Sequence, residues 1–152
     1  MRNPILMKVF DEIFRIVLNF FLSIGTDGTC RFQKSEVAAY VPGGSVNITA
    51  YDEAQILTAV GLAGPVSIAF EVTDDFQAYT GGVFSDPTCH QDPEHVNHAV
   101  LIVGYGSENG QDFWIVKNSW GADWGEQGYF RIIRGKNECG LATCASYPNV
   151  FG

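Results

Sequence analysis

His98 and Asn118 are the residues of this sequence whose types and positions fit catalytic chemistry. An imidazole beside a carboxamide suits general acid and base work, because the asparagine oxygen can accept a hydrogen bond from one ring nitrogen and leave the other nitrogen facing a nucleophile. The two residues are far apart along the chain, so the elements around them must bring them together.

Two apolar runs rich in Val, Ile and aromatic residues, 97–106 and 113–121, predict two β-strands around these residues. The segment 106–110 between them is a cluster of turn residues. His98 stands at the start of the first strand and Asn118 at the end of the second. An antiparallel hairpin therefore places both side chains at the same end of a sheet.

The composition predicts one packed domain, with 46% hydrophobic and 13% aromatic residues in a chain of 152. The formal net charge of −8 argues against nucleic acid and against an anionic membrane surface as partners, because no cluster of Lys and Arg could contact phosphates. The four cysteines lack the paired spacing of a zinc site. We therefore expect disulfides, no metal and no cofactor.

One helix is expected near 52–61, with Asp52 as N-cap, Gln55 in a capping box, and an end at Gly61. Further strands are expected in an alternating run at 66–72 and at 128–134. The chain then turns back toward 145–148. Many short strands and one good helix predict an α+β fold that is mostly antiparallel β.

The first 25 residues differ in character from the rest, and three interpretations remain open. Arg2 and Lys8 ahead of an apolar run and small residues fit a secretory signal peptide, although Asp11 and Glu12 weaken that reading. The segment could instead be a start foreign to the domain, from a mispredicted or alternative first exon, or a helix of the fold. A membrane span is disfavoured because no long uncharged run is present.

Several long strings resemble the papain family of cysteine peptidases, most closely its cathepsin H-like branch. They are VNITAYDEAQ, GPVSIAFEVTDDF, NHAVLIVGYG, WIVKNSWG and WGEQGYFRIIRGKNECGLATCASYP, and with Cys30 they extend the resemblance over roughly Gly28 to Val150. The resemblance implies that 26–152 is the C-terminal, right-hand domain of that fold, a β-barrel-like half. It leaves 1–25 as an atypical hydrophobic segment outside the domain.

The resemblance also implies roles for individual residues. His98 matches the base that pairs with a cysteine thiolate, Asn118 matches the residue that orients its ring, and Trp120 would shield their hydrogen bond from water. The family's pocket for the substrate side chain two residues before the cut is matched by small and aliphatic residues, namely Ala69, Val96 and Ala99.

The cysteines are assigned by the same resemblance. It pairs Cys89 with Cys139 inside the domain and makes Cys30 a disulfide half whose partner lies in the other half of the fold. Cys144 matches an extra cysteine that holds a propeptide remnant in the cathepsin H-like branch. Cys30 and Cys144 are thus expected to be unpaired or externally paired in this chain. Asn47 begins an N-glycosylation sequon, Asn-Ile-Thr.

The family's nucleophile lies in a Cys-Gly-Ser-Cys-Trp type signature well upstream of the histidine, and these 152 residues do not contain that signature. The resemblance therefore predicts a chain that contributes the His and Asn of a peptide-hydrolysing site and is inactive alone. Its expected partners are peptide or protein substrates and the left-hand domain, in the lysosome or outside the cell. The alternative is a non-catalytic module or decoy that binds cystatin-like inhibitors or propeptides.

Overall fold

The computed structural model describes Ser35, Val41 and residues 43–150, so segment 1–25 and Cys30 lie outside the described residues. The chain divides into two compact units, and the unit 45–147 contains the sheet and its helices. In the other unit, the backbone N–H of Asn149 donates to the carbonyl of Gly44 at 2.8 Å.

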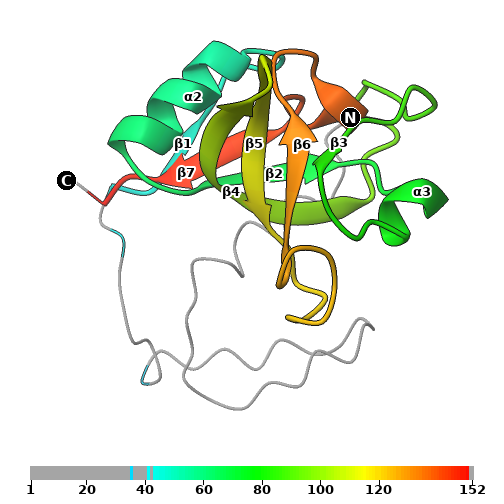
Figure 1. The fold of residues 1–152 in the computed structure, drawn as a ribbon. Helices are drawn as coiled ribbons and strands as arrows, with labels where there is room; N and C mark the ends of the chain where they lie inside the picture. Colours follow the sequence, from blue (N-terminus) through cyan, green and yellow to red (C-terminus); the bar gives the residue numbers. More distant parts are fainter. Residues whose placement is uncertain (1–34, 36–40, 42, 151–152) are drawn as a thin grey trace. The chain divides into compact units, whose positions relative to one another are not determined.

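A seven-stranded sheet forms the body of the unit 45–147 (Figure 1). Its strands, in spatial order, are β1 (Ser45–Asn47), β7 (Ala145–Pro148), β2 (Val66–Phe70), β4 (His98–Glu108), β5 (Gln111–Lys117), β6 (Tyr129–Ile133) and β3 (Val83–Phe84). The pairs β2–β4, β2–β7, β4–β5 and β5–β6 are antiparallel, and β3–β6 is parallel. With one main helix, this confirms the α+β, mostly antiparallel prediction.

Helix α2 (Glu53–Leu62) packs against β4 and β2 (Figure 1). The side chain of Asp52 caps it by accepting from the backbone N–H of Gln55 at 2.8 Å. Gln55 does not complete a capping box, because its Oε1 accepts from the N–H of Thr49 at 2.7 Å instead. The helix lies where the sequence predicts it, near 52–61, and ends at Leu62 rather than at Gly61. None of the helices in the described residues is long and apolar enough to cross a membrane.

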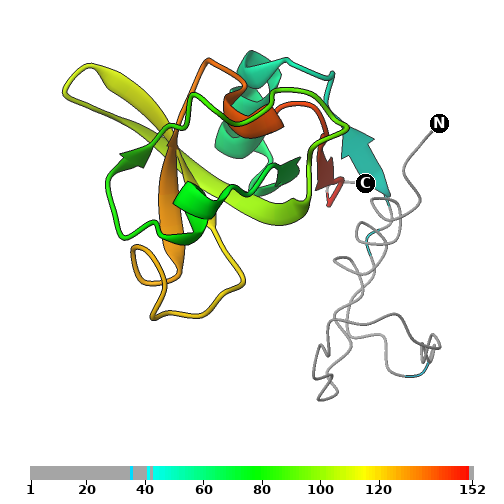
Figure 2. The same ribbon diagram turned by 90° about the vertical axis from the view of Figure 1, so that its right-hand side faces the viewer.

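The hairpin β4–β5 matches the sequence prediction closely, with Asn109 and Gly110 at its tip. A shift in strand register between Ile102 and Gly104 interrupts the pairing, and Figure 2 shows that β4 is strongly curved. Bulges bend a strand and increase its twist. The curvature lets one strand pair with β2 at its start and with β5 along its remaining length.

Strand β2 departs from the expected alternation, because all five of its residues are buried. It lies between β7 and β4, and both of its faces are covered. Its last residue, Phe70, belongs to an aromatic cluster that also contains residues of α3 (Asp74–Gln77), β3, β6 and the loops. The members of this aromatic cluster are Phe70, Phe76, Tyr79, Phe84, Trp120, Trp124 and Phe130. The ring of Phe76 contacts each of the other six.

Candidate active site

The hairpin brings His98 and Asn118 into contact. Nε2 of His98 lies 3.0 Å from Oδ1 of Asn118, and the two residues stand at the first position of β4 and directly after β5. A carboxamide oxygen can only accept, so Nε2 of His98 carries the proton in this bond. Nδ1 has no hydrogen-bond partner among the described residues and is therefore available to exchange a proton with another group.

Asn118 is held in place by three features. The residue is 8% exposed, and its Oδ1 also accepts from the N–H of Ser119 at 2.8 Å, which fixes the orientation of the amide. Its own N–H donates to the carbonyl of Gly128 at 2.9 Å. Gly128 has φ +89°, and a Cβ there would lie 3.1 Å from the carbonyl oxygen of Gly121. Glycine is therefore required at 128 for the loop to reach Asn118.

Asn97 anchors the other partner and is a residue that the sequence reasoning missed. Its N–H donates to the carbonyl of Phe70 at 3.1 Å. Its side chain accepts from the N–H of Val72 at 2.8 Å and donates to the carbonyl of Val72 at 3.2 Å. The register pairs Phe70 with His98. Asn97 therefore ties the start of β4 to the end of β2. A polar residue directly before the strand was the available signal, but nothing in the sequence indicated its partner.

Two aromatic rings lie beside the half-buried His98 imidazole. The ring centroid of Trp120 lies 5.1 Å away and that of Phe70 lies 6.0 Å away. Trp120 rests on Phe76 and Trp124 of the aromatic cluster, although it remains 38% exposed. Apolar surroundings strengthen a hydrogen bond by lowering the local dielectric. The contacts of Trp120 are compatible with the expected shielding role, which stays a prediction.

The three residues expected to form a substrate pocket are placed differently from one another. Ala69 and Ala99 are cross-strand partners, the first buried and the second half-buried. Because side chains alternate along a strand, both lie on the face opposite to that of His98. Val96 lies in the loop before β4, half-buried, where its Cγ1 would be 3.4 Å from a Cβ placed on Gly140. The pocket assignment stays a prediction.

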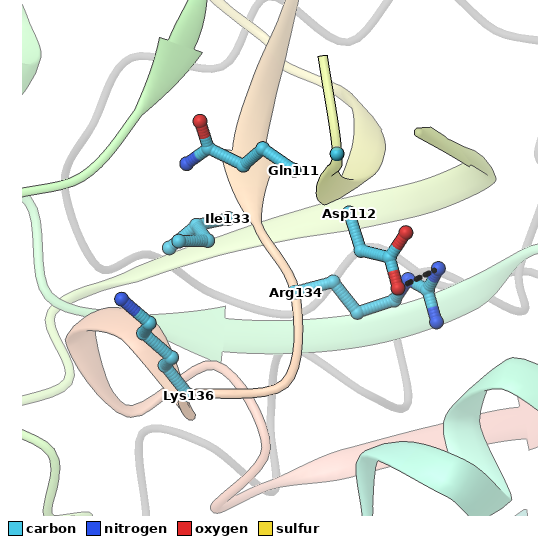
Figure 3. A pocket seen from close by; sticks show the side chains of 6 residues that line it. Gln111, Asp112, Ile133, Arg134 and Lys136 are labelled. Carbon is cyan, nitrogen blue, oxygen red and sulfur yellow. Dashed lines mark ion pairs between the residues drawn. The ribbon is translucent and has the colours of Figure 1, made fainter. Parts of the chain in front are cut away.

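A surface hollow of about 430 Å³ lies at the other end of the hairpin (Figure 3). It is lined by Gly110, Gln111, Asp112, Ile133, Arg134 and Lys136. Figure 3 shows Asp112 and Arg134 joined by an ion pair, at 3.0 Å between carboxylate and guanidinium. Gly110 is at the tip of the hairpin and His98 is at its base. The hollow is therefore separate from the His98–Asn118 pair.

Cys89 and Cys139 form a disulfide, which is the pairing that the resemblance implied. Together with Glu138 they place three potential metal-binding atoms within 4.8 Å of one another. Two of those atoms are the joined sulfurs, so this group offers no thiolate ligands.

Cys144 is a free thiol in the part of the chain that the structure describes, and burial raises its pKa. Asn47 is exposed, so its side chain is accessible for glycosylation.

Comparisons with known proteins found a matching family model and similar chains. A family model described as papain family cysteine protease matches residues 18–149. The chain is 60% identical over 125 residues to pro-cathepsin H of Mus musculus, covering 82% of this chain and 37% of that protein. It is 56% identical over 126 residues to the thiol protease aleurain of Arabidopsis thaliana, covering 83% and 35%.

A solved structure, digestive procathepsin L 3 from the larval midgut of Tenebrio molitor, matches with a TM-score of 0.74 and 49% sequence identity. The match covers 81% of this chain and 40% of the Tenebrio molitor protein. The chain thus spans a little over a third of the length of the curated relatives named above.

Proposed function

The chain belongs to the papain family of cysteine proteases, and from that premise we propose that it supplies the histidine and asparagine of a cathepsin H-like site that hydrolyses peptide bonds. His98 is the general acid and base in this proposal, and Asn118 is a positioning residue. The observation that carries it is the 3.0 Å contact between Nε2 of His98 and Oδ1 of Asn118, with Nδ1 left free.

The geometry supports separate roles for His98, which transfers protons, and Asn118, which positions its ring. A cysteine thiolate facing Nδ1 attacks the substrate carbonyl carbon, and the C–N bond breaks as Nδ1 of the His98 imidazolium protonates the departing amine. A water molecule then attacks the resulting thioester, gives a proton to Nδ1, and releases the carboxylic acid and the thiolate. The Nε2–H group of His98 stays hydrogen-bonded to Asn118 in both steps, so the proton transfers take place at Nδ1.

The thiolate comes from outside these 152 residues in this proposal, because the chain contains no Cys-Gly-Ser-Cys-Trp type sequence. We assign 26–152 to the right-hand domain and leave 1–25 outside it. The oxyanion donor also comes from the left-hand domain, and loss of one such donor typically costs about 10² to 10³ in turnover. The 152-residue chain alone is therefore expected to be inactive.

The proposed setting is the lysosome or the extracellular space, with peptides or proteins as substrates. The disulfide between Cys89 and Cys139 supports an oxidising compartment of the secretory route. The exposed position of Asn47 supports glycosylation there. Similarity to pro-cathepsin H and to the thiol protease aleurain supports proteins or peptides as substrates.

The test is complementation. The chain is refolded together with the left-hand domain of mouse pro-cathepsin H, and hydrolysis of fluorogenic peptide amides with free and blocked N-termini is measured. We expect hydrolysis by the complex and none by the chain alone. His98→Ala should lower kcat by about 10³-fold or more, since removing a catalytic base disables the whole constellation. Asn118→Ala should lower kcat without abolishing it.

His95→Ala is the matched control, because it removes an exposed histidine outside this site and should leave the rate unchanged. Circular dichroism of each variant separates loss of chemistry from loss of fold. A His98→Ala complex as fast as the parent would overturn the proposal. A folded complex that hydrolyses nothing, from a chain that binds cystatin-like inhibitors, would instead support the decoy function.

A further inference from the structure

A second pair of histidines, His90 and His95, lies in the loop that leads into β4. Their rings stack with centroids 3.6 Å apart and planes inclined by only 8°. Their side chains are 51% and 46% exposed. Solvent ions can therefore reach both rings, and the proposed peptidase mechanism uses neither of them.

Each ring is oriented by a carboxylate at the same nitrogen. Nδ1 of His90 lies 3.1 Å from both carboxylate oxygens of Glu71, and Nδ1 of His95 lies 2.7 Å from Oδ1 of Asp92. A carboxylate accepts, so each Nδ1 carries a proton. In the neutral ring the lone pair is then on Nε2. Neither Nε2 has a hydrogen-bond partner among the residues that the structure describes.

Carboxylates lie beside both rings. Asp92 hydrogen-bonds His95 and raises the pKa of that imidazole, with smaller contributions from Glu71 and Glu94. The same bond lowers the pKa of Asp92. These carboxylates offset the charge of a cation bound between the rings.

We propose that His90 and His95 form a surface site for a divalent transition-metal ion such as Zn²⁺, bound through their Nε2 atoms. Histidine ligands in metal sites almost always donate their other ring N–H to a carboxylate, carbonyl or water, which is the arrangement that Glu71 and Asp92 already provide. Imidazole nitrogens suit zinc, copper and nickel, whereas Ca²⁺ prefers oxygen ligands. Water molecules complete the coordination. Neither histidine takes part in the proposed peptide hydrolysis.

The backbone around the pair is well anchored. Oδ1 of Asp92 accepts from the N–H groups of Glu94 and His95 at 3.0 and 3.2 Å. The side-chain amide of Asn137 donates to the carbonyl of Gln91 at 2.8 Å. The metal would therefore meet a preformed loop. The exposed rings must leave their stacked arrangement before both Nε2 atoms can bind one ion.

The site would connect the loop to the elements that carry the candidate active site. Glu71 directly follows β2, whose last residue Phe70 contacts the His98 ring. His95 is followed by Val96 and by Asn97, which anchors the start of β4. Binding of an ion at His90 and His95 would thus fix the loop from which the base His98 emerges.

The experiment is a calorimetric titration of Zn²⁺ into the 152-residue chain with its thiols alkylated, so that cysteines do not bind the ion. We expect one zinc per chain at pH 7.5. His90→Ala and His95→Ala should each weaken binding at least tenfold. Asp92→Asn should weaken it by about tenfold, which is typical when a residue that orients a ligand is replaced.

Two controls make the result decisive. His98→Ala removes another histidine and should leave zinc affinity unchanged. Ca²⁺ should not compete, since the proposed ligands are nitrogens. The proposal is overturned if no zinc binds at pH 7.5, if His90→Ala and His95→Ala bind as tightly as the parent, if His98→Ala is the variant that loses binding, or if Ca²⁺ binds equally well.

Discussion

Asp86 is a buried carboxylate, 5% exposed, in the loop after β3. Its oxygens accept from the hydroxyl of Thr88 at 2.6 Å, from the N–H of Thr88 at 2.8 Å and from the hydroxyl of Thr73 at 2.7 Å. Thr73 is also the N-cap of α3. The hydrogen bonds from Thr88, followed by that from Thr73, hold the pKa of Asp86 below its ordinary value although burial opposes them.

A carboxylate with a lowered pKa stabilises the fold above its ordinary pKa, and this stabilisation is lost as the pH falls through the lower value of the folded state. We therefore expect urea denaturation to show a decrease in stability below about pH 4 that depends on Asp86. Asp86→Asn should reduce the free energy of unfolding at pH 7 by about 1–3 kcal/mol, because neutral hydrogen bonds replace charge-assisted ones. It should also flatten the decrease at acid pH.

Asp75→Asn, at an exposed position of α3, is the matched control and should change the free energy of unfolding little. If Asp86→Asn lost as much stability between pH 5 and pH 3 as the parent chain does, Asp86 would not be the source of the acid sensitivity.

At the scale of elements, one carboxylate of α2 accepts hydrogen bonds from the sheet and from the turn after β6. Glu53, its first residue, accepts from Nε1 of Trp114 at 2.8 Å and from the backbone N–H groups of Gly135 and Asn137 at 2.8 and 2.6 Å. Trp114 lies in β5 and is fully buried, so its indole N–H depends on this acceptor. Glu53 thus connects the helix, the centre of the sheet and the turn after β6.

Glu53→Gln keeps the shape of the side chain but turns an NH₂ group toward donors. At least one of the three N–H groups then loses its acceptor, and we expect a loss of about 1–3 kcal/mol in the free energy of unfolding, measured with urea. Glu108→Gln is the control, because its ion pair with Arg131 involves a side chain that is 55% exposed and should contribute less than about 1 kcal/mol. Equal losses in the two variants would contradict the joining role of Glu53.

The local pattern was enough to predict the hairpin and α2. Apolar runs on either side of Asn109 and Gly110 specify the two strands, and Asp52 supplies a cap whose partner is three residues away. The burial of both faces of β2 was not predictable in this way. It depends on β4 and β7, which are distant in sequence and come together only in the folded sheet.

Only those contacts of the candidate site that lie within the local hairpin could be predicted from the sequence. His98 and Asn118 stand on neighbouring strands at the open end of a local hairpin, so their contact follows from its antiparallel geometry. The role of Asn97 requires the end of β2, and the stacking of His90 on His95 requires a loop shaped by Asp92 and by contacts with Asn137. No periodic pattern in the sequence encodes such contacts.

At the scale of the whole molecule, the disulfide joins two segments that follow the paired strands β3 and β6. Cys89 lies in the loop between β3 and β4, and Cys139 lies in η2 (Glu138–Gly140), between β6 and β7. Cys139 is fully buried in the core. The Oε1 atom of the neighbouring Glu138 accepts from the N–H of Asp86 at 2.6 Å, so a hydrogen bond reinforces the same junction.

The disulfide spans 50 positions, and closing a loop of that length removes entropy from the unfolded chain worth about 4 kcal/mol in the chain-entropy model. We therefore expect the double variant Cys89→Ala/Cys139→Ala to unfold at a much lower urea concentration than the parent, with a loss of that size in the free energy of unfolding. Cys144→Ala removes a thiol without opening a loop and should have a much smaller effect. The reduced parent should resemble the double variant. If the double variant and the parent had the same urea midpoint, hydrogen bonding between Asp86 and Glu138 would be sufficient to hold the junction.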